Sequence, residues 1–222
     1  MKKFLVSILF LVTVLSLSHS AAGQAGSSSL NSQLIDAAFK GDVAAVQQLL
    51  DKGADIEYKN GLTNKTALSY ASGKGYPDMV KLLLARGANI EAKDIMEATP
   101  LINAPSSGNM EIIRLLLEKG AKIDEQDTIG NSPLSRAAYY GETEVVKLLL
   151  EKGANIDATN KTNGSTALMR ASYKGRIEVV KLLLEKGANI DAKDKDGVTA
   201  LKLATNGGYA EVVKLLQEHG AH

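Results

Sequence analysis

Cysteine and tryptophan are absent from this chain of 222 residues, and aromatic residues make up only 5% of it. Without cysteine the protein has no thiol nucleophile, no thiolate metal ligand and no disulfide. Because aromatic residues are so few, the core must be built from Leu, Ile, Val and Ala. Apolar residues reach 45% of the composition, so a chain of this length can bury a sizeable core by packing alone.

Histidine is almost as scarce, with His19 near the start and His219 and His222 at the end of the chain. Asp and Glu are numerous, but they recur at a regular spacing, which is typical of solvated faces and not of a paired catalytic acid and base. No glycine-rich motif has the spacing of a phosphate-binding loop. The sequence therefore predicts that the protein is not an enzyme and holds no metal or cofactor.

Charge is nearly balanced. The formal net charge is +1, and it falls to −1 without Lys2 and Lys3, which leaves 24 basic and 25 acidic residues. A protein that binds nucleic acid or an anionic membrane usually carries a clear excess of basic residues. We therefore expect neither as the partner.

The N-terminus has the pattern of a secretory signal peptide. Lys2 and Lys3 precede an apolar stretch from Phe4 to Leu17, and the small residues of SHSAAGQA follow. A retained membrane anchor is the alternative, but this stretch is shorter than the roughly 20 residues that a spanning helix needs. We expect a signal peptide over residues 1–22, a flexible leader over 23–30 and an exported protein, periplasmic or secreted, without a stable membrane anchor after cleavage.

The rest of the chain is repetitive. The segment EVVKLLLEKGANIDA occupies residues 144–158 and again 178–192. Gly-Ala pairs after an apolar run begin at positions 53, 87, 120, 153, 187 and 220, with spacings of 34, 33, 33, 34 and 33 residues. A period of about 33 residues is typical of a turn plus two short helices. Six units are expected, at about 31–59, 60–93, 94–126, 127–159, 160–193 and 194–222.

Five of these units share a second motif, which reads KTALSYA, ATPLINA, NSPLSRA, STALMRA and VTALKLA. Together with the period, these motifs resemble the ankyrin repeat family over residues 31–222. The resemblance implies an all-α solenoid of helix-turn-helix units joined by extended, β-hairpin-like fingers. It also implies a non-catalytic, protein-binding function through the finger tips and the groove-facing side of the first helix of each unit.

Local signals agree with this fold. A Thr or Ser stands where each first helix would begin and can accept a hydrogen bond from its first turn; these residues are Thr66, Thr99, Ser132, Thr166 and Thr199. The Gly of each Gly-Ala pair is placed to end a second helix in a left-handed conformation. In the third unit, Glu97 replaces the usual finger glycine and Pro105 interrupts the first helix, so we expect a local distortion there.

The ends of the array differ from its middle. Gln217 occupies the position of Leu84, Leu117, Leu150 and Leu184, and Gln47 and Gln48 stand where later units have Lys-Leu. Polar residues at the outer faces of terminal units keep a solenoid from stacking on further copies. We therefore expect capped ends and a monomer.

The candidate binding residues are those where the repeats differ from one another. Tyr139, Tyr140 and Tyr173, with Lys174, should lie side by side at the ends of adjacent first helices, where Tyr suits an interface anchor. The alternative is that one Tyr of each pair packs on the neighbouring helix. Phe39, Lys40 and Lys74 occupy the corresponding ends in earlier units.

The fingers supply further candidates. Ile95, Met96 and Ile129 are apolar at positions that water would normally cover, and Asn131 follows in the same finger as Ile129. An exposed apolar patch often marks a contact site, although these side chains could instead tuck against one another. We expect an exported adaptor that binds an unidentified protein, and so inhibits or protects it. The alternative is a binder of a non-protein polymer such as cell-wall glycan.

Overall fold

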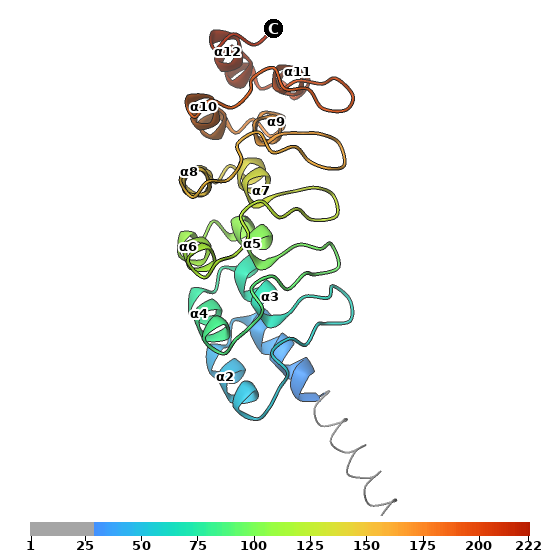
Figure 1. Ribbon diagram of the computed structural model, residues 1–222, viewed down its shortest axis with the longest axis vertical. Coiled ribbons are helices and arrows are strands. Elements are labelled where there is room, and N and C mark those ends of the chain that lie inside the picture. The colour runs from blue at the N-terminus through green and yellow to red at the C-terminus, as the bar shows by residue number, and fades with distance from the viewer. Residues whose placement is uncertain (1–28) are drawn as a thin grey trace, which may run out of the picture.

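The computed structural model describes residues 29–222, which form one continuous stack of helical units (Figure 1). A helix over residues 29–40 pairs with α2 (Val43–Asp51) in the first unit. The later pairs are α3 (Ala67–Lys74) with α4 (Pro77–Ala85), α5 (Pro100–Asn103) with α6 (Met110–Glu118), α7 (Pro133–Tyr140) with α8 (Thr143–Glu151), α9 (Ala167–Tyr173) with α10 (Ile177–Glu185), and α11 (Ala200–Asn206) with α12 (Ala210–Glu218). The predicted all-α solenoid is confirmed.

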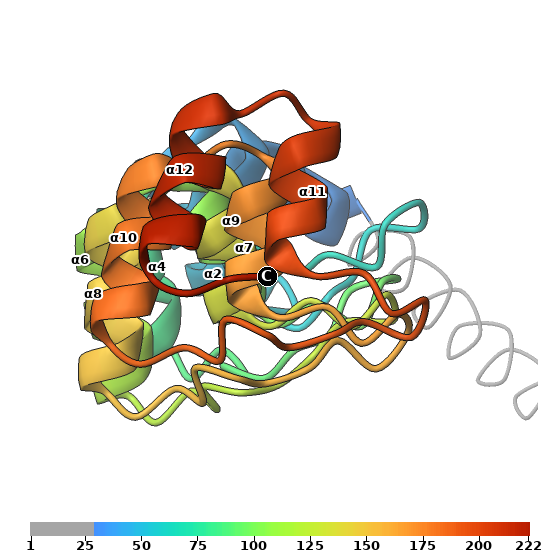
Figure 2. The same cartoon turned by 90° about the horizontal axis from the view of Figure 1, so that it is seen from above.

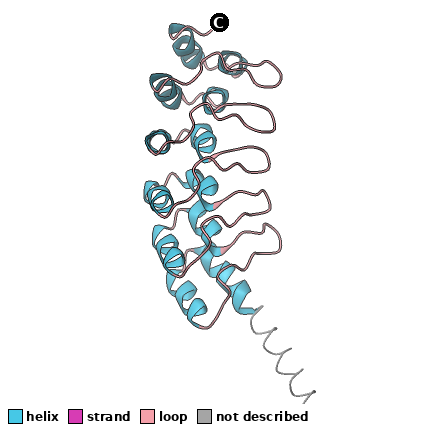
Figure 3. Ribbon diagram, in the orientation of Figure 1, coloured by secondary structure: helices cyan, strands magenta, loops and turns pink. Residues whose placement is uncertain are grey.

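The first helices and the second helices form two parallel columns (Figure 1). Seen from above, the loops that join one unit to the next all extend to the same side, beyond the column of first helices (Figure 2). We call these loops the fingers. Residues 29–222 contain no strand (Figure 3), so the fingers resemble β-hairpins only in their turns, as where the Asp94 amide donates to the Ala98 carbonyl at 3.2 Å.

The predicted signal peptide, and the predicted leader as far as residue 28, lie outside the described residues. Residues 29 and 30 of that leader are helical. Across residues 29–222, no helix has the length and apolar character needed to cross a membrane.

Each first helix from the second unit onward begins where the sequence predicts. The hydroxyls of Thr66, Thr99, Ser132, Thr166 and Thr199 accept hydrogen bonds from the amide three residues later. Such a cap satisfies one of the amides that have no partner inside the helix and is worth about 1 kcal/mol. Pro100 and Pro133 occupy the first helical position, where a missing N–H costs nothing.

The core runs between the two columns and consists of aliphatic side chains. In α6, Ile112, Ile113 and Leu116 are fully buried, and the other second helices repeat this pattern. No aromatic ring is among the largest fully buried side chains of the described residues. The prediction of a core built from Leu, Ile, Val and Ala is therefore confirmed, with Met79 and Met169 added.

Glycine at the end of a first helix allows the next unit to approach closely. Gly175 has a φ of +63°, and a side chain there would collide with the ring of Tyr209 from the following unit. Gly141, with a φ of +87°, is covered in the same way by Arg176. Glycine is therefore favoured at these positions for two reasons: the positive φ, and the close contact with a side chain of the next unit.

Neighbouring units are also joined by hydrogen bonds at the bases of the fingers. The Glu57 carboxylate accepts from the Asn89 amide at 2.7 Å, Glu91 from Lys122 at 2.8 Å and Asp157 from Asn189 at 2.9 Å. Each acceptor is the acidic residue of one ANIDA-like segment, and each donor lies in the next. The regular spacing of these acids thus reflects one bond repeated from unit to unit.

The third unit is distorted, as predicted. Its first helix, α5, has only four residues and continues as a 3-10 turn, η1 (Ala104–Ser107). Pro105 lacks the N–H that an α-helix needs there, and the Ser106 and Ser107 hydroxyls donate to the Asn103 and Ala104 carbonyls at 2.7 and 2.8 Å. In the preceding finger, Glu97 has a φ of +56°, a conformation that favours glycine.

Candidate protein-binding surface

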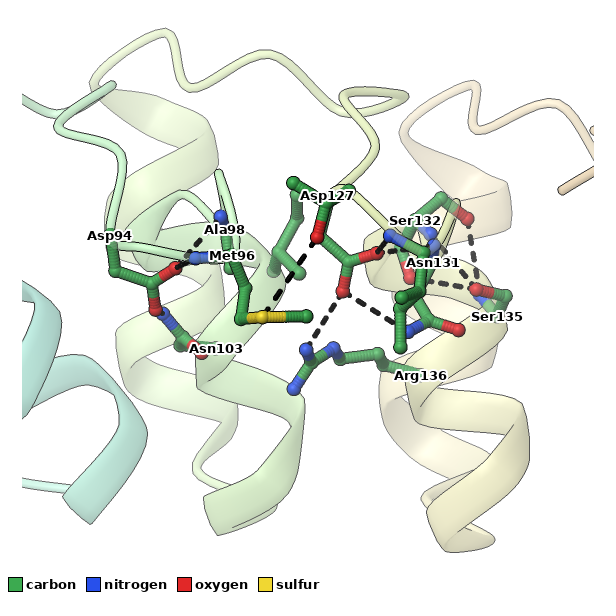
Figure 4. Close-up of polar contacts among 12 residues, drawn as sticks. Asp94, Met96, Ala98, Asn103, Asp127, Asn131, Ser132, Ser135 and Arg136 are labelled. Carbon is green, nitrogen blue, oxygen red and sulfur yellow. Dashed lines mark hydrogen bonds and ion pairs between the residues drawn. The ribbon is translucent and has the colours of Figure 1, made fainter. Parts of the chain in front are cut away.

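Two buried carboxylates shape the fingers of the third and fourth units (Figure 4). Asp94 accepts from the Met96 and Ala98 amides at 2.9 and 3.0 Å and from the side chain of Asn103 at 3.3 Å. Asp127 makes the same backbone contacts with its own finger and also accepts from Arg136 at 2.9 Å. These acids hold the finger against the first helix.

Asn131 belongs to this network. It is 4% exposed, donates its side-chain amide to Asp127 at 3.0 Å and accepts from Arg170 of the next unit at 2.9 Å. A buried side chain with both ends bonded offers little to a partner. We therefore give Asn131 a positioning role and leave it out of the proposed contact surface.

Tyr139, Tyr140, Tyr173 and Lys174 lie together, as the sequence suggests. The rings of Tyr139 and Tyr140 meet edge to face with centroids 5.5 Å apart. The Lys174 ammonium lies 4.7 Å from the Tyr139 ring and 5.4 Å from the Tyr173 ring, so it bridges two units. Tyr140 and Tyr173 are 40% and 51% exposed, whereas Tyr139 is half-buried. Tyr139 thus follows the alternative in which one ring of the pair packs on its neighbour.

A second aromatic cluster lies in the first two units. Phe39 is 49% exposed and meets the ring of Tyr70 edge to face at 5.6 Å. The Lys74 ammonium sits 4.1 Å from the Phe39 ring, and Lys40 beside it is exposed. Tyr70 was missed by the sequence reasoning, although its place in KTALSYA, one turn before Lys74, was a usable signal.

The two clusters border one hollow of about 350 Å³. Its lining includes the small residues Gly73 and Ser106 with Asn103, the rings of Phe39 and Tyr70 from the first two units, and Tyr140 and Arg136 from the fourth. Its lining therefore comes from four successive units. We call the surface formed by Phe39, Tyr70, Lys74, Tyr139, Tyr140, Tyr173 and Lys174, with this hollow, the aromatic groove.

Several cations of the aromatic groove have no acidic partner. The nine ion pairs formed within residues 29–222 include Arg136 with Asp127 but none of Lys74, Arg170 or Lys174. Burial lowers the pKa of Arg170, whose guanidinium stacks 4.7 Å from the Tyr139 ring. The Tyr139 side chain raises the pKa of Lys174.

The finger tips carry a separate apolar patch. Ile95 and Ile129 are 58% and 50% exposed, and Met96 is 40% exposed. Leu62, in the finger of the second unit, is 85% exposed and was missed by the sequence analysis. Backbone bonds hold adjacent tips together, from the Ile95 amide to the Thr63 carbonyl and from the Thr128 amide to the Met96 carbonyl, both at 2.8 Å. We call the four exposed apolar residues Leu62, Ile95, Met96 and Ile129 the finger-tip patch.

Within the part of the chain that the structure describes, no group of three or more His, Cys, Asp or Glu side chains could hold a metal ion. The aromatic groove and the finger-tip patch present exposed rings, exposed aliphatic side chains and cations. Such a composition is suited to contact with another macromolecule.

Comparison with known proteins supports this assignment. The family model described as "Ankyrin repeats (3 copies)" matches residues 11–94, 34–127, 93–160 and 134–222, and ankyrin repeats are typical protein-binding modules whose stacked units present an extended surface.

Individual relatives match about two repeats each. Serine/threonine-protein kinase 12 of Arabidopsis thaliana is 36% identical over 72 residues, which are 32% of this chain and 16% of the relative. The 2-5A-dependent ribonuclease of Mus musculus is 45% identical over 74 residues, 33% of this chain and 10% of the relative. Ankyrin repeat and SOCS box protein 6 of Mus musculus is 37% identical over 84 residues, 37% of this chain and 19% of the relative.

The matched part of this chain thus spans less than a fifth of each of these three relatives. Their kinase and ribonuclease names describe those whole proteins, and the likeness to this chain is one of repeats. The family model, in contrast, covers nearly the whole chain in overlapping matches. The chain belongs to the ankyrin repeat family.

Proposed function

We propose that the protein is an exported, non-catalytic adaptor that binds a partner protein through the aromatic groove and the finger-tip patch, and so inhibits or protects that partner. The observation that carries this proposal is the exposure of Phe39, Tyr140 and Tyr173 beside cations without an acidic partner. Exposed rings of this kind act as interface anchors because they bring a large, rigid contact area.

The supporting contrast comes from the second helices. Their exposed positions carry Glu and Lys residues that repeat from unit to unit, as in α8 and α10. A surface that repeats itself carries little information about one partner, whereas the aromatic groove differs in every unit. The proposed contact therefore lies on the first helices and the fingers.

A pull-down with the tagged chain tests this proposal, using the exported fraction of the source cells and identification by mass spectrometry. Tyr140→Ala and Tyr173→Ala should each weaken binding of a captured protein by about 2 kcal/mol or more. Their urea midpoints should change less than for a core ring, because Tyr140 and Tyr173 are 40% and 51% exposed. Arg114→Ala on α6 is the control, since Arg114 is exposed and lies on the opposite column.

Two results would contradict the proposal. If the tyrosine variants bind the captured protein as the control does, the aromatic groove is not its contact surface. If the chain captures no protein but is retained on cell-wall material, the function is polymer binding, for which the lysines beside the rings would be suited. Export is tested separately by the mass of the secreted chain, which should lack residues 1–22.

A further inference from the structure

Basic side chains are in excess along the column of first helices. The first helices and the residues that cap them carry six basic side chains and one acidic one, Asp36. Counted with their caps in the same way, the second helices carry twelve acidic and eleven basic side chains. The basic set of the first helices is Lys40, Lys74, Arg136, Arg170, Lys174 and Lys202. The near-zero net charge of the whole chain therefore hides a positive face along the first helices.

The positive face is not neutralised from within. Only Arg136 of the six is paired with a carboxylate among residues 29–222, and its Nε has no hydrogen-bond partner there. Arg170 is partly desolvated and bonds to the neutral amide of Asn131, while its Nε is also unpartnered. The charge of Asp127 acts on Arg170 from beyond ion-pair distance, and a partly buried cation that lacks a close counter-charge raises the free energy of the unbound protein. A carboxylate from outside would lower it again.

The hollow adds a second element of recognition. Its walls include Lys74 and the rings of Phe39, Tyr70 and Tyr140, beside the polar side chains of Ser69, Asn103 and Ser106. Such walls suit an apolar or aromatic side chain, which gains area and edge-to-face contacts there.

We propose that the aromatic groove binds an extended, acidic segment of the partner protein, with carboxylates on Lys74 and on Lys174 with Arg170, and one apolar or aromatic side chain in the hollow. This inference rests on the proposed protein-binding function and names the chemistry of the partner. Complementary charge steers association and selects among partners.

The length of such a segment follows from the spacing of the helices. Lys74 belongs to the second unit and Lys174 to the fifth, so three steps between adjacent first helices separate them. Packed helices lie about 8–10 Å apart, and an extended chain advances about 3.3 Å per residue. The segment that reaches both cations is therefore about nine residues long.

Fluorescence anisotropy with two labelled polymers tests the inference. The probes are poly-glutamate and a random copolymer of glutamate and tyrosine of the same length, each titrated with the purified chain at about 0.1 M salt, where exposed charges are screened beyond roughly 10 Å. The copolymer should bind more tightly than poly-glutamate because it alone can fill the hollow. Lys74→Glu with Lys174→Glu should weaken both probes by more than about tenfold.

The matched control is Lys147→Glu with Lys181→Glu. These lysines are exposed on α8 and α10 and form no ion pair within residues 29–222, so the net charge changes equally but on the other face. This variant should lose less than about twofold in binding. Similar losses for the two pairs would show that only the overall charge matters and would overturn the inference.

Gly73→Leu tests the hollow alone. Gly73 lies within α3, and a β-carbon there would be 3.7 Å from Asn103, an ordinary van der Waals contact, so we expect a leucine side chain to extend into the hollow. It should remove the advantage of the copolymer and leave poly-glutamate binding unchanged. An unchanged advantage, failure of the native chain to bind the copolymer, or equally strong competition by dextran sulfate would each overturn the inference.

The same variants separate this inference from the proposed function. If the pull-down captures a protein whose binding is unaffected by Lys74→Glu with Lys174→Glu, the adaptor function stands and the acidic-segment inference fails. If no protein is captured at all, the adaptor function fails, whatever the copolymer does.

Discussion

Alanine in place of Gly130 should be far more damaging than alanine in place of Gly153, although both glycines lie in the fourth unit and both have a positive φ, +78° and +91°. At Gly153 an added β-carbon has no atom within 4 Å. Its cost is the left-handed conformation alone, about 1–2 kcal/mol, less about 0.4–1 kcal/mol because alanine also restricts the unfolded chain. The net loss should be about 1 kcal/mol.

At Gly130 the same carbon would meet the side chain of Asn160, with the amide carbon at 2.6 Å, and the Lys161 nitrogen at 2.7 Å. Asn160 is buried and makes three hydrogen bonds, donating to the Ile129 carbonyl at 2.7 Å and accepting from the Thr162 and Asn163 amides at 2.7 and 3.0 Å. Displacing it forfeits roughly 1 kcal/mol for each bond. The total loss for Gly130→Ala should reach about 3–4 kcal/mol.

Urea denaturation followed by far-UV circular dichroism measures both losses under the same conditions. The slope against urea should be the same for the two variants, so that the midpoints report stability alone. The bond from Asn160 to Ile129 also joins the fourth finger to the fifth. Equal losses for Gly130→Ala and Gly153→Ala would refute the packing of Asn160 against the glycine and the joining of the fingers through it.

Four further outcomes are expected. Asp157→Ala should lower the free energy of unfolding by about 1 kcal/mol, because the hydrogen bond from the Asn189 amide to Asp157 is lost. The control is Asp191→Ala, since the Asp191 carboxylate makes no bond to a following unit within the described residues; it should lower the free energy of unfolding by less in the same urea assay. Equal losses would contradict a stabilising role of the bond to Asn189. Glu97→Gly should raise the free energy of unfolding by several tenths of a kcal/mol, since glycine tolerates the positive φ, and a lower free energy of unfolding would disprove strain at Glu97. Pro105→Ala should add helical circular dichroism and about 1 kcal/mol of stability by restoring an N–H, whereas unchanged or lower stability would mean that the helix gains nothing beyond Asn103. Lys93 lowers the pKa of Glu125 from 4.5, so this carboxylate stabilises the fold above its unfolded pKa, and the stabilisation is lost as the pH falls through the folded pKa. Glu125→Gln should therefore lower the urea midpoint near neutral pH but leave it unchanged at a pH well below 4.5. An equal loss at the two pH values would show that the effect is not ionic.

The positions of the helices could be predicted because their signals are local. Thr66 and its counterparts cap a helix through a bond to an amide three residues away, and this geometry needs no knowledge of the rest of the fold. The distortion of the third unit was visible for the same reason, since Pro105 and Glu97 each constrain their own backbone.

Contacts between units were harder to predict. Each second helix from α4 onward has an acidic residue three positions before a basic one. Of these five pairs, only Asp78 with Lys81 forms an ion pair among the described residues, at 3.5 Å. Lys81 also reaches Glu111 of the next unit, and Lys214 turns to Glu218 at 3.7 Å. Long exposed side chains have several partners of nearly equal free energy, so the sequence pattern does not choose among them.

The candidate surface was predicted in part. The adjacency of Tyr139, Tyr140 and Tyr173 followed from the repeat period, but the half-burial of Tyr139 between Arg170 and Lys174 did not. The excess of basic side chains on the first helices also escaped notice, because a balanced total charge conceals it. The burial of Asn131 depends on Arg170, which lies 39 residues further along the chain.

The short helix α5 and the turn η1 have a consequence for how the array opens. In a linear stack each unit is coupled to its neighbours alone, so the least stable unit divides the stack into two halves that can separate without either melting. The third unit, with its proline turn and its strained Glu97, is that dividing point. The hollow of the aromatic groove takes residues from both sides of it, from Phe39 to Tyr140. A partner seated there would clasp the two halves together, and amide hydrogen exchange would slow across the entire molecule, far beyond the residues that it touches.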